Sequence, residues 1–187
     1  MTIVNEIKKD VKKLCDEYKK EATDNYDFWN EHIKYVCREA VLLAKRYDAD
    51  EQIVLLGALL HDIALIKRVG KRDNHHVNGF KIAIKMLSKY NYPQEKALRV
   101  ANCVLHHRSS KDALNIEEIC VCDADIISHF DNIPMIFDYA YKEKNVNVNN
   151  VRCWIKKYFE DDFNDLSSQT KKYYSKKYKA ICDVLFR

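Results

Sequence analysis

The sequence predicts an all-α fold of about eight or nine helices, arranged as a single domain over residues 1–187. Only 3 Gly and 2 Pro occur in the chain, whereas a β-rich fold would need more of these residues for its turns. Apolar residues recur at helical spacing along most of the sequence. A chain of 187 residues can bury one sizeable core but is short for two.

Amphipathic helices are expected from the beginning of the chain. One apolar stripe is formed by Val4, Ile7, Val11, Leu14 and Tyr18. A second helix should span about residues 27–47 and carry His32 on its apolar face. Asp48 or Asp50 can cap a third helix. The body of that helix, residues 53–60, is apolar on every side, which is typical of a buried central helix.

Polar loops separate the remaining helices. Helices are expected over about residues 74–90, 93–107 and 116–129, from Pro134 onward, and twice more after the loop NVNVNN. The basic segment IKRVGKRDN and the polar segment RSSKDALN should form two of the loops. The C-terminal helices are expected to pack onto the core through an apolar stripe with helical spacing. This stripe consists of Tyr174, Tyr178, Ile181 and Leu185.

Charge, cysteine content and the absence of long apolar runs argue against a nucleic-acid-binding, secreted or membrane protein. The net charge of +4 is too mild to indicate a nucleic-acid partner, and the C-terminal lysines occupy the solvated side of the tyrosine stripe. The N-terminus lacks the apolar region of a signal peptide, and the longest apolar run is far too short to span a membrane. Seven cysteines without disulfide-scaffold spacing suggest reduced thiols. We therefore expect a cytoplasmic protein without a membrane partner.

Polar residues interrupt the apolar helices at three places. His61 and Asp62 end the apolar third helix, where an unpaired charge would cost several kcal/mol. His32 lies on the apolar face of the second helix, and Asp123 and Asp125 interrupt the sixth. Such groups are tolerated when they are paired or bind a metal. Three or four nitrogen and oxygen ligands from three helices suit a divalent cation such as Mn, Mg, Fe or Co.

The order of these residues resembles the HD-domain superfamily of metal-dependent phosphohydrolases. The motif runs through WNEHIKYV, LLHDI, VLHH and a DAD segment, over about residues 28–130. The resemblance implies an HD-domain-like all-α fold and hydrolysis of phosphate esters or anhydrides, often in nucleotides. It also implies one divalent metal ion (Mn, Mg, Co, Fe or Ni). The implied metal ligands are His32, His61, Asp62 and Asp125.

The fourth ligand has two candidates. Helical periodicity groups Asp123 with the most apolar face of its helix, while Asp125 shares a face with His129. Periodicity alone therefore favours Asp123 as the inward residue. The family pattern places the ligand at the second Asp of the segment, so we choose Asp125.

Further histidines suggest substrate contacts or a second metal. His75 stands four residues before Gly79, which is similar to a motif of HD proteins that hold two metals, and the pair His106-His107 also resembles that branch. We expect His75, His106 or His107 to contact the substrate, with a second metal ion as the alternative. Exposed histidines at helix ends are the plain structural interpretation.

The basic loop after the doublet could bind phosphate. It carries Lys67, Arg68, Lys71 and Arg72, and Lys67 is the first choice because it is closest to the doublet. In the expected mechanism Asp62 ligates the metal and orients a water, Lys67 and His107 bind phosphate, and His107 protonates the leaving group. The expected partner is a small phosphorylated molecule such as a nucleotide.

Two other functions remain open. The same scaffold could carry a two-iron oxygenase, or the chain could be a non-catalytic metal-binding regulatory domain. A homodimer is also an alternative, because nothing in the sequence sets the oligomeric state.

Overall fold

Helix α3 (Glu51–Leu60) lies at the centre of the fold. The computed structural model describes residues 2–22 and 26–186. Seven of the ten residues of α3 are buried, from Ile53 to Leu60 with one partly exposed exception. The helix packs against α1, α2, α6 and α7, which explains why its sequence is apolar on every side.

The described residues form ten α-helices and two single-turn segments, without a β-strand. The helices around α3 are α1 (Ile3–Glu21), α2 (Lys34–Tyr47), α4 (Ile63–Ile66), α5 (His75–Ser88), α6 (Gln94–His106) and α7 (Ile116–Asp131). The C-terminal helices are α8 (Ile133–Lys142), α9 (Val151–Asp165) and α10 (Ser168–Leu185). A π-helical turn, η1 (Trp29–Ile33), precedes α2, and a 3-10 turn, η2 (Arg72–Asn74), precedes α5. The all-α prediction is confirmed, and the helix beyond the expected nine is the single turn α4.

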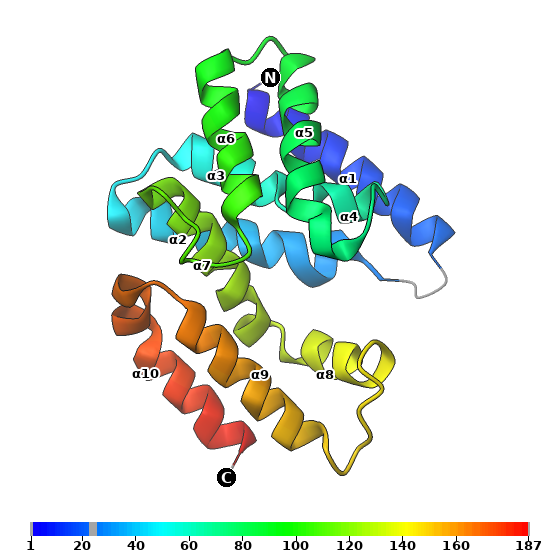
Figure 1. The fold of residues 1–187 in the computed structure, drawn as a ribbon, viewed down its shortest axis with the longest axis vertical. Helices are drawn as coiled ribbons and strands as arrows, with labels where there is room; N and C mark the ends of the chain where they lie inside the picture. The colour runs from blue at the N-terminus through cyan, green and yellow to red at the C-terminus, as the bar shows by residue number, and fades with distance from the viewer. Residues whose placement is uncertain (1, 23–25, 187) are drawn as a thin grey trace.

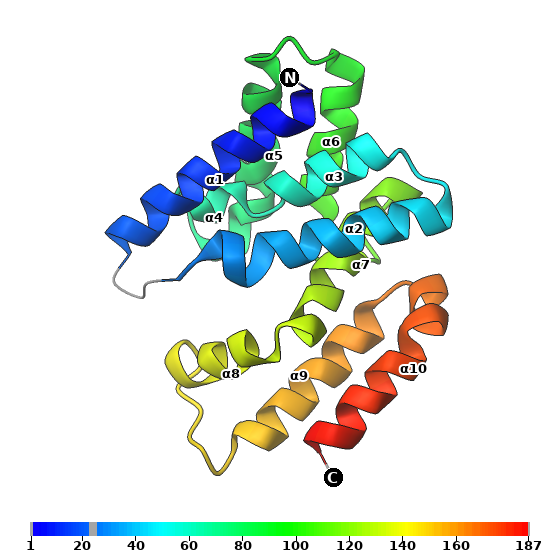
Figure 2. The same ribbon diagram turned by 180° about the vertical axis from the view of Figure 1, so that it is seen from behind.

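Helix α7 joins two layers of helices. Its first half lies among α2, α3 and α6, and its end reaches the layer formed by α8, α9 and α10 (Figures 1 and 2). Phe130, near the end of α7, contacts the rings of Phe159 at 5.0 Å and Tyr178 at 5.5 Å between centroids. Tyr178 in turn stacks on Phe163 at 4.0 Å. The C-terminal tyrosine stripe therefore contacts the end of α7 through Tyr178.

The buried carboxylate of Asp123 also joins α7 to the start of α10 through hydrogen bonds. Asp123 is fully buried and accepts hydrogen bonds from the backbone N–H of Ser167, at 3.0 Å, and from its hydroxyl. Burial raises the pKa of Asp123, although the bonds from Ser167 and Thr170 oppose this rise. Ser167 is itself the N-cap of α10. Asp123 is thus an inward residue, but it faces the C-terminal layer.

The helix starts follow the expected capping chemistry. Of the two candidate aspartates before α3, Asp50 is the cap, and it accepts hydrogen bonds from the N–H groups of Gln52 and Ile53. All seven cysteines are unpaired, and four of them are buried in the core. Burial raises the pKa of Cys120 to about 12, which keeps the thiol protonated. Within the described residues, no helix combines the length and the apolar character that crossing a bilayer requires.

Gly57 sets the distance between α3 and its neighbours. A Cβ atom at this position would lie 2.7 Å from Cβ of Cys103 on α6 and 3.0 Å from Cγ2 of Val121 on α7. Gly57→Ala should therefore lower the free energy of unfolding by about 1–3 kcal/mol, because overpacking forces the helices apart. Urea unfolding followed by circular dichroism measures this change. Ala at this position without destabilisation would contradict the close packing.

Candidate metal centre

The His61-Asp62 doublet lies in a short break between helices α3 and α4. Helix α3 ends at Leu60, and Asp62 has φ −100° and ψ 17°, outside the helical region. Helix α4 begins directly afterwards. Adjacent residues of a regular helix point about 100° apart, and this non-helical turn brings both side chains to one place. The doublet therefore lies where two helices meet in the interior, with His61 fully buried and Asp62 8% exposed.

His32 comes from the π-helical turn before α2. Such turns are often found at functional sites. Asp27 holds the start of this segment by accepting hydrogen bonds from the backbone N–H and the side-chain amide of Asn30, both at 3.0 Å, and from Lys19 at 2.8 Å. His32 is 6% exposed and shares the buried face of its helix with Val36.

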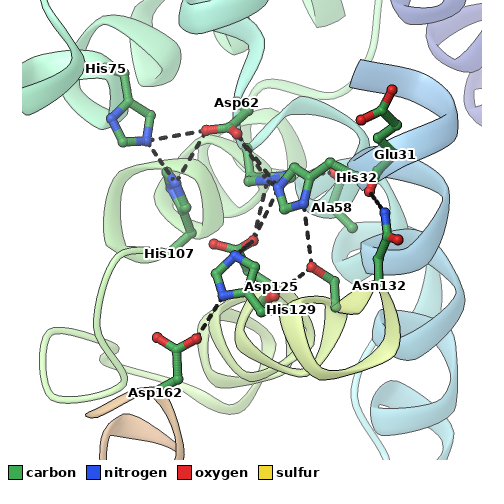
Figure 3. Close-up of polar contacts among 12 residues, drawn as sticks. Glu31, His32, Ala58, Asp62, His75, His107, Asp125, His129, Asn132 and Asp162 are labelled. Atoms are coloured by element: carbon green, nitrogen blue, oxygen red, sulfur yellow. Dashed lines mark hydrogen bonds and ion pairs between the residues drawn. The ribbon is translucent and has the colours of Figure 1, made fainter. Parts of the chain in front are cut away.

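The first group of polar atoms gathers around His32. Its Nε2 atom lies 2.9 Å from Nε2 of His61 and 3.2 Å from Oδ1 of Asp125 (Figure 3). Oδ2 of Asp62 lies 3.6 Å from the same two imidazole nitrogens. The structure thus brings together the four residues that the sequence suggested as metal ligands.

A second group lies on the other side of Asp62. Its other oxygen, Oδ1, is 3.2 Å from Nε2 of His75 and 3.7 Å from Nε2 of His107 (Figure 3). The two imidazole nitrogens are 3.0 Å apart. Gly79 allows this approach, because a Cβ atom there would lie 2.8 Å from Cγ1 of Val104 on α6. The carboxylate of Asp62 therefore lies between two pairs of imidazoles.

In their neutral form, all four imidazoles would direct an unprotonated nitrogen toward the carboxylates. In each ring Nδ1 faces a backbone carbonyl or hydroxyl oxygen, which assigns the proton of the neutral ring to Nδ1. The acceptors are the carbonyls of Ala58 for His61, Arg72 for His75 and Val104 for His107, and the hydroxyl of Ser128 for His32. Ser128 donates its own proton to the carbonyl of Asp125. Metal-binding histidines are typically held in this way.

These atoms fit a divalent cation. Two bare nitrogens 2.9–3.0 Å apart cannot hydrogen-bond to each other when both carry lone pairs. Oδ1 of Asp125 is buried and has no hydrogen-bond donor in the described structure. Two triads of residues could each hold a cation, His32–His61–Asp62 and Asp62–His75–His107. Within each triad the ligand atoms lie within 4.8 Å of one another. A cation bound at each triad would satisfy the lone pairs that face it.

The protonation states also favour cation binding. Without a cation, burial opposes ionisation of Asp62, but the positive charge that the surrounding imidazoles carry when protonated, His61 foremost, holds the pKa of this carboxyl well below its usual value. Burial likewise opposes ionisation of Asp125, yet His32 and His61 lower its pKa. Burial and the neighbouring His61 lower the pKa of His107 to about 4. Both carboxylates are therefore charged near neutral pH, and His107 is neutral.

Two predicted site residues lie outside this cluster. His106 is half-buried, and its Nδ1 atom lies 2.8 Å from a carboxylate oxygen of Glu118, away from His107. Lys67 is exposed at the end of α4, and no contact in the described structure joins its ammonium to the cluster. The substrate roles of His106 and Lys67 remain predictions.

Two further residues lie at the site that were not predicted from the sequence, His129 and Asp162. His129 stacks on His32 with ring centroids 6.0 Å apart, and its Nε2 atom lies 4.0 Å from Oδ1 of Asp125. Its Nδ1–H donates to Asp162 of α9 at 2.8 Å. The signal for His129 was available, because it follows Asp125 by four residues and shares its helix face. Asp162 carried no such signal, since only tertiary packing brings α9 to this place.

The His129–Asp162 pair has a testable pH dependence. Burial disfavours the imidazolium, but the charge and hydrogen bond of Asp162 outweigh it and raise the pKa of His129 to about 9. The pair should therefore stabilise the metal-free protein fully below the unfolded pKa of about 6.5 and lose this contribution as the pH rises through about 9. NMR titration of metal-free protein should show His129 titrating near pH 9. Asp162→Asn should move this midpoint downward, while Asp161→Asn should leave it in place; equal titrations in both variants would contradict the assignment.

Known proteins share the sequence pattern and the fold of this chain. The HD domain family model matches residues 30–129, which span His32, the doublet, Asp125 and His129. A search of curated proteins found no match. Three solved structures share the fold. YpgQ of Bacillus subtilis has a TM-score of 0.68 at 19% identity, covering 95% of this chain and 88% of its own.

The other two structures give similar values. The Lin1889 protein of Listeria innocua has a TM-score of 0.68 at 20% identity and covers 98% of this chain and 94% of its own. An HD-superfamily hydrolase of Bacillus thuringiensis has a TM-score of 0.72 at 16% identity and covers 97% and 92%. Because the family match extends over more than half of the 187 residues, the chain belongs to the HD domain family.

Proposed function

We propose that this HD domain protein is a metal-dependent phosphohydrolase. Its reaction would be hydrolysis of a phosphate ester or anhydride in a nucleotide or a related small phosphorylated molecule. The observation that carries the proposal is the Asp62 carboxylate between two pairs of imidazoles, each pair with its Nε2 atoms directed at it. A divalent cation bound there supplies Lewis-acid chemistry, because it lowers the pKa of a coordinated water and offsets phosphoryl charge.

Each residue of the cluster then has a role. His32, His61, Asp62 and Asp125 would hold the cation through the atoms that converge around His32. Asp62 is well suited to orient the attacking water, because its two carboxylate oxygens face different pairs of imidazoles. Its low pKa keeps it an acceptor of hydrogen bonds.

The second triad supports a second cation. His75, His107 and Asp62 offer two imidazole nitrogens and one carboxylate oxygen within 4.8 Å. A neutral His107 with a pKa near 4 suits a metal ligand better than a proton donor for the leaving group. The two-ion version of the proposal therefore assigns His75 and His107 as ligands, and leaves the phosphate to basic residues outside the cluster.

A two-iron oxygenase would use the same six side chains, so the chemistry needs a direct assay. Purified protein is incubated with a panel of nucleotides and phosphate esters in Mn²⁺, Mg²⁺, Co²⁺, Ni²⁺ or Fe²⁺. Release of phosphate or pyrophosphate supports the proposal. Iron-dependent oxygen uptake without phosphate release would replace it with the oxygenase, and inactivity throughout would favour a regulatory metal-binding domain.

Substitution of the doublet should abolish hydrolysis. His61→Ala removes a side chain that would hold the cation, and Asp62→Ala removes one that would both hold the cation and orient the water. We expect a loss of at least about a hundredfold in kcat/KM, in line with disrupted metal sites. Asp161→Ala, an exposed position on α9, is the matched control and should retain activity. Wild-type rates in Asp62→Ala would refute the mechanism.

Alanine variants of the two α7 aspartates should differ in the amount of metal they bind. Asp125→Ala should lose bound metal by elemental analysis, because Oδ1 of Asp125 faces His32. Asp123→Ala should keep the metal and instead destabilise the fold by about 1–3 kcal/mol, since Ser167 loses its buried acceptor. Metal loss in Asp123→Ala with retention in Asp125→Ala would reassign the ligand. A stoichiometry of two ions per chain in the wild type would support metal binding by the second triad. A stoichiometry of one ion would reject it.

A further inference from the structure

Arg72 is placed differently from the other basic residues of its loop. Its carbonyl accepts the Nδ1–H of His75, so its backbone is tied directly to the second triad. Its side chain is exposed, and in the described structure its guanidinium has no carboxylate or carbonyl partner. Arg68 instead contacts Glu21 and the Tyr18 carbonyl. Arg72 therefore carries an unneutralised charge beside the metal centre.

The guanidinium of Arg72 extends toward the C-terminal layer. It lies 5.9 Å from the ring centroid of Tyr139 on α8. Burial raises the pKa of Tyr158 on α9, with Asp162 and Asp125 adding to the rise, and the charge of Arg72 opposes it. Arg72 is thus within electrostatic reach of the rings beside Asp125. A phosphate located between Arg72 and the cluster would meet a planar group of hydrogen-bond donors on this side.

An aromatic row runs outward from the same place along α9. Trp154, Tyr158 and Asp162 are four residues apart, so they share one face, and each step advances about 6 Å along the helix. Asp162 holds His129 next to Asp125. Tyr158 contacts the His129 ring at 5.7 Å between centroids, and Trp154 stacks on Tyr158 at 5.1 Å.

Tyr139 adds a third ring to the row. Its centroid lies 6.2 Å from that of Trp154 and 6.4 Å from that of Tyr158. All three residues are only half-buried. Residues 133–165, which carry the three rings, lie outside the part of the chain that matches the HD domain family.

We propose that Arg72 and the aromatic row of Tyr139, Trp154 and Tyr158 bind the part of the substrate that lies beyond the scissile phosphate. In this inference, which rests on the proposed phosphohydrolase function, Arg72 pairs with a phosphate group and the row stacks against a planar ring. The substrate class is therefore a nucleotide or another aromatic phosphate, in preference to a phosphate without a ring. Base–aromatic stacking and guanidinium–phosphate pairing are both strong enough to determine such a preference.

Ligand binding can be measured without catalysis through Trp154. The chain has two tryptophans, so Trp29→Phe leaves Trp154 as the reporter. This protein, loaded with Ca²⁺ in place of an activating metal, is titrated with ATP and with inorganic tripolyphosphate, which has the phosphates but no ring. ATP should quench Trp154 fluorescence and bind at least about fivefold more tightly than tripolyphosphate. Equal affinities, or no change in Trp154 fluorescence at saturation with ATP, would overturn the stacking role.

Matched variants in the same background test each contact. Arg72→Ala should lower the affinity for both ligands by about tenfold or more. Arg46→Ala is its control, because Arg46 also packs on a tyrosine, Tyr173, at 3.7 Å but stands 14 residues beyond His32, about 21 Å along the helix. Tyr139→Ala should weaken the binding of ATP but not the binding of tripolyphosphate. Tyr141→Ala, on the same helix, should weaken neither.

The results separate the inference from the function on which it rests. Equal effects of Arg72→Ala and Arg46→Ala would overturn the role of Arg72, even if the enzyme hydrolyses phosphate esters. ATP binding with the expected variant pattern but without hydrolysis under any activating metal would retain the binding site and reject the phosphohydrolase.

Discussion

The carboxylate of Asp62 and the imidazoles on either side of it form an arrangement that the whole fold must stabilise. Burying two carboxylates and four histidines costs free energy unless each polar atom finds a partner. Backbone carbonyls and one hydroxyl satisfy the Nδ1 atoms, which leaves the Nε2 atoms and carboxylate oxygens facing one another. A cation is the partner that satisfies this set, so metal binding and folding stability should be linked.

The supporting helices explain how such a site can be held rigidly. The apolar helix α3 ends directly at the doublet, and close contacts at Gly57 and Gly79 fix its position and that of α5. Helix α7 contributes Asp125 from one face and Asp123 from another, so one helix both completes the cluster and anchors α10. Displacement of α7 would therefore disturb the site and the C-terminal layer together.

The C-terminal layer lies beside the metal centre and contributes residues to its surroundings. Asp162 on α9 holds His129 beside Asp125, and the same face of α9 continues into the aromatic row. Arg72 approaches this row from the opposite layer. The metal centre thus lies between residues within the family match and residues beyond it, and the latter are the natural place for substrate preference to be set.

The sequence by itself determined the helices and the first group of site residues. Its helical periodicity predicted every long helix, because this signal is local. The polar interruptions pointed to His32, to His61-Asp62 and to either Asp123 or Asp125, and only the resemblance to the HD-domain pattern favoured Asp125. Tertiary structure decided the rest. It separated Asp125 from Asp123, which differ only in the neighbour each one faces, and it placed Asp162 and Arg72 near the cluster. Contacts between helices far apart in the chain leave no mark in local spacing, since they depend on how the layers pack.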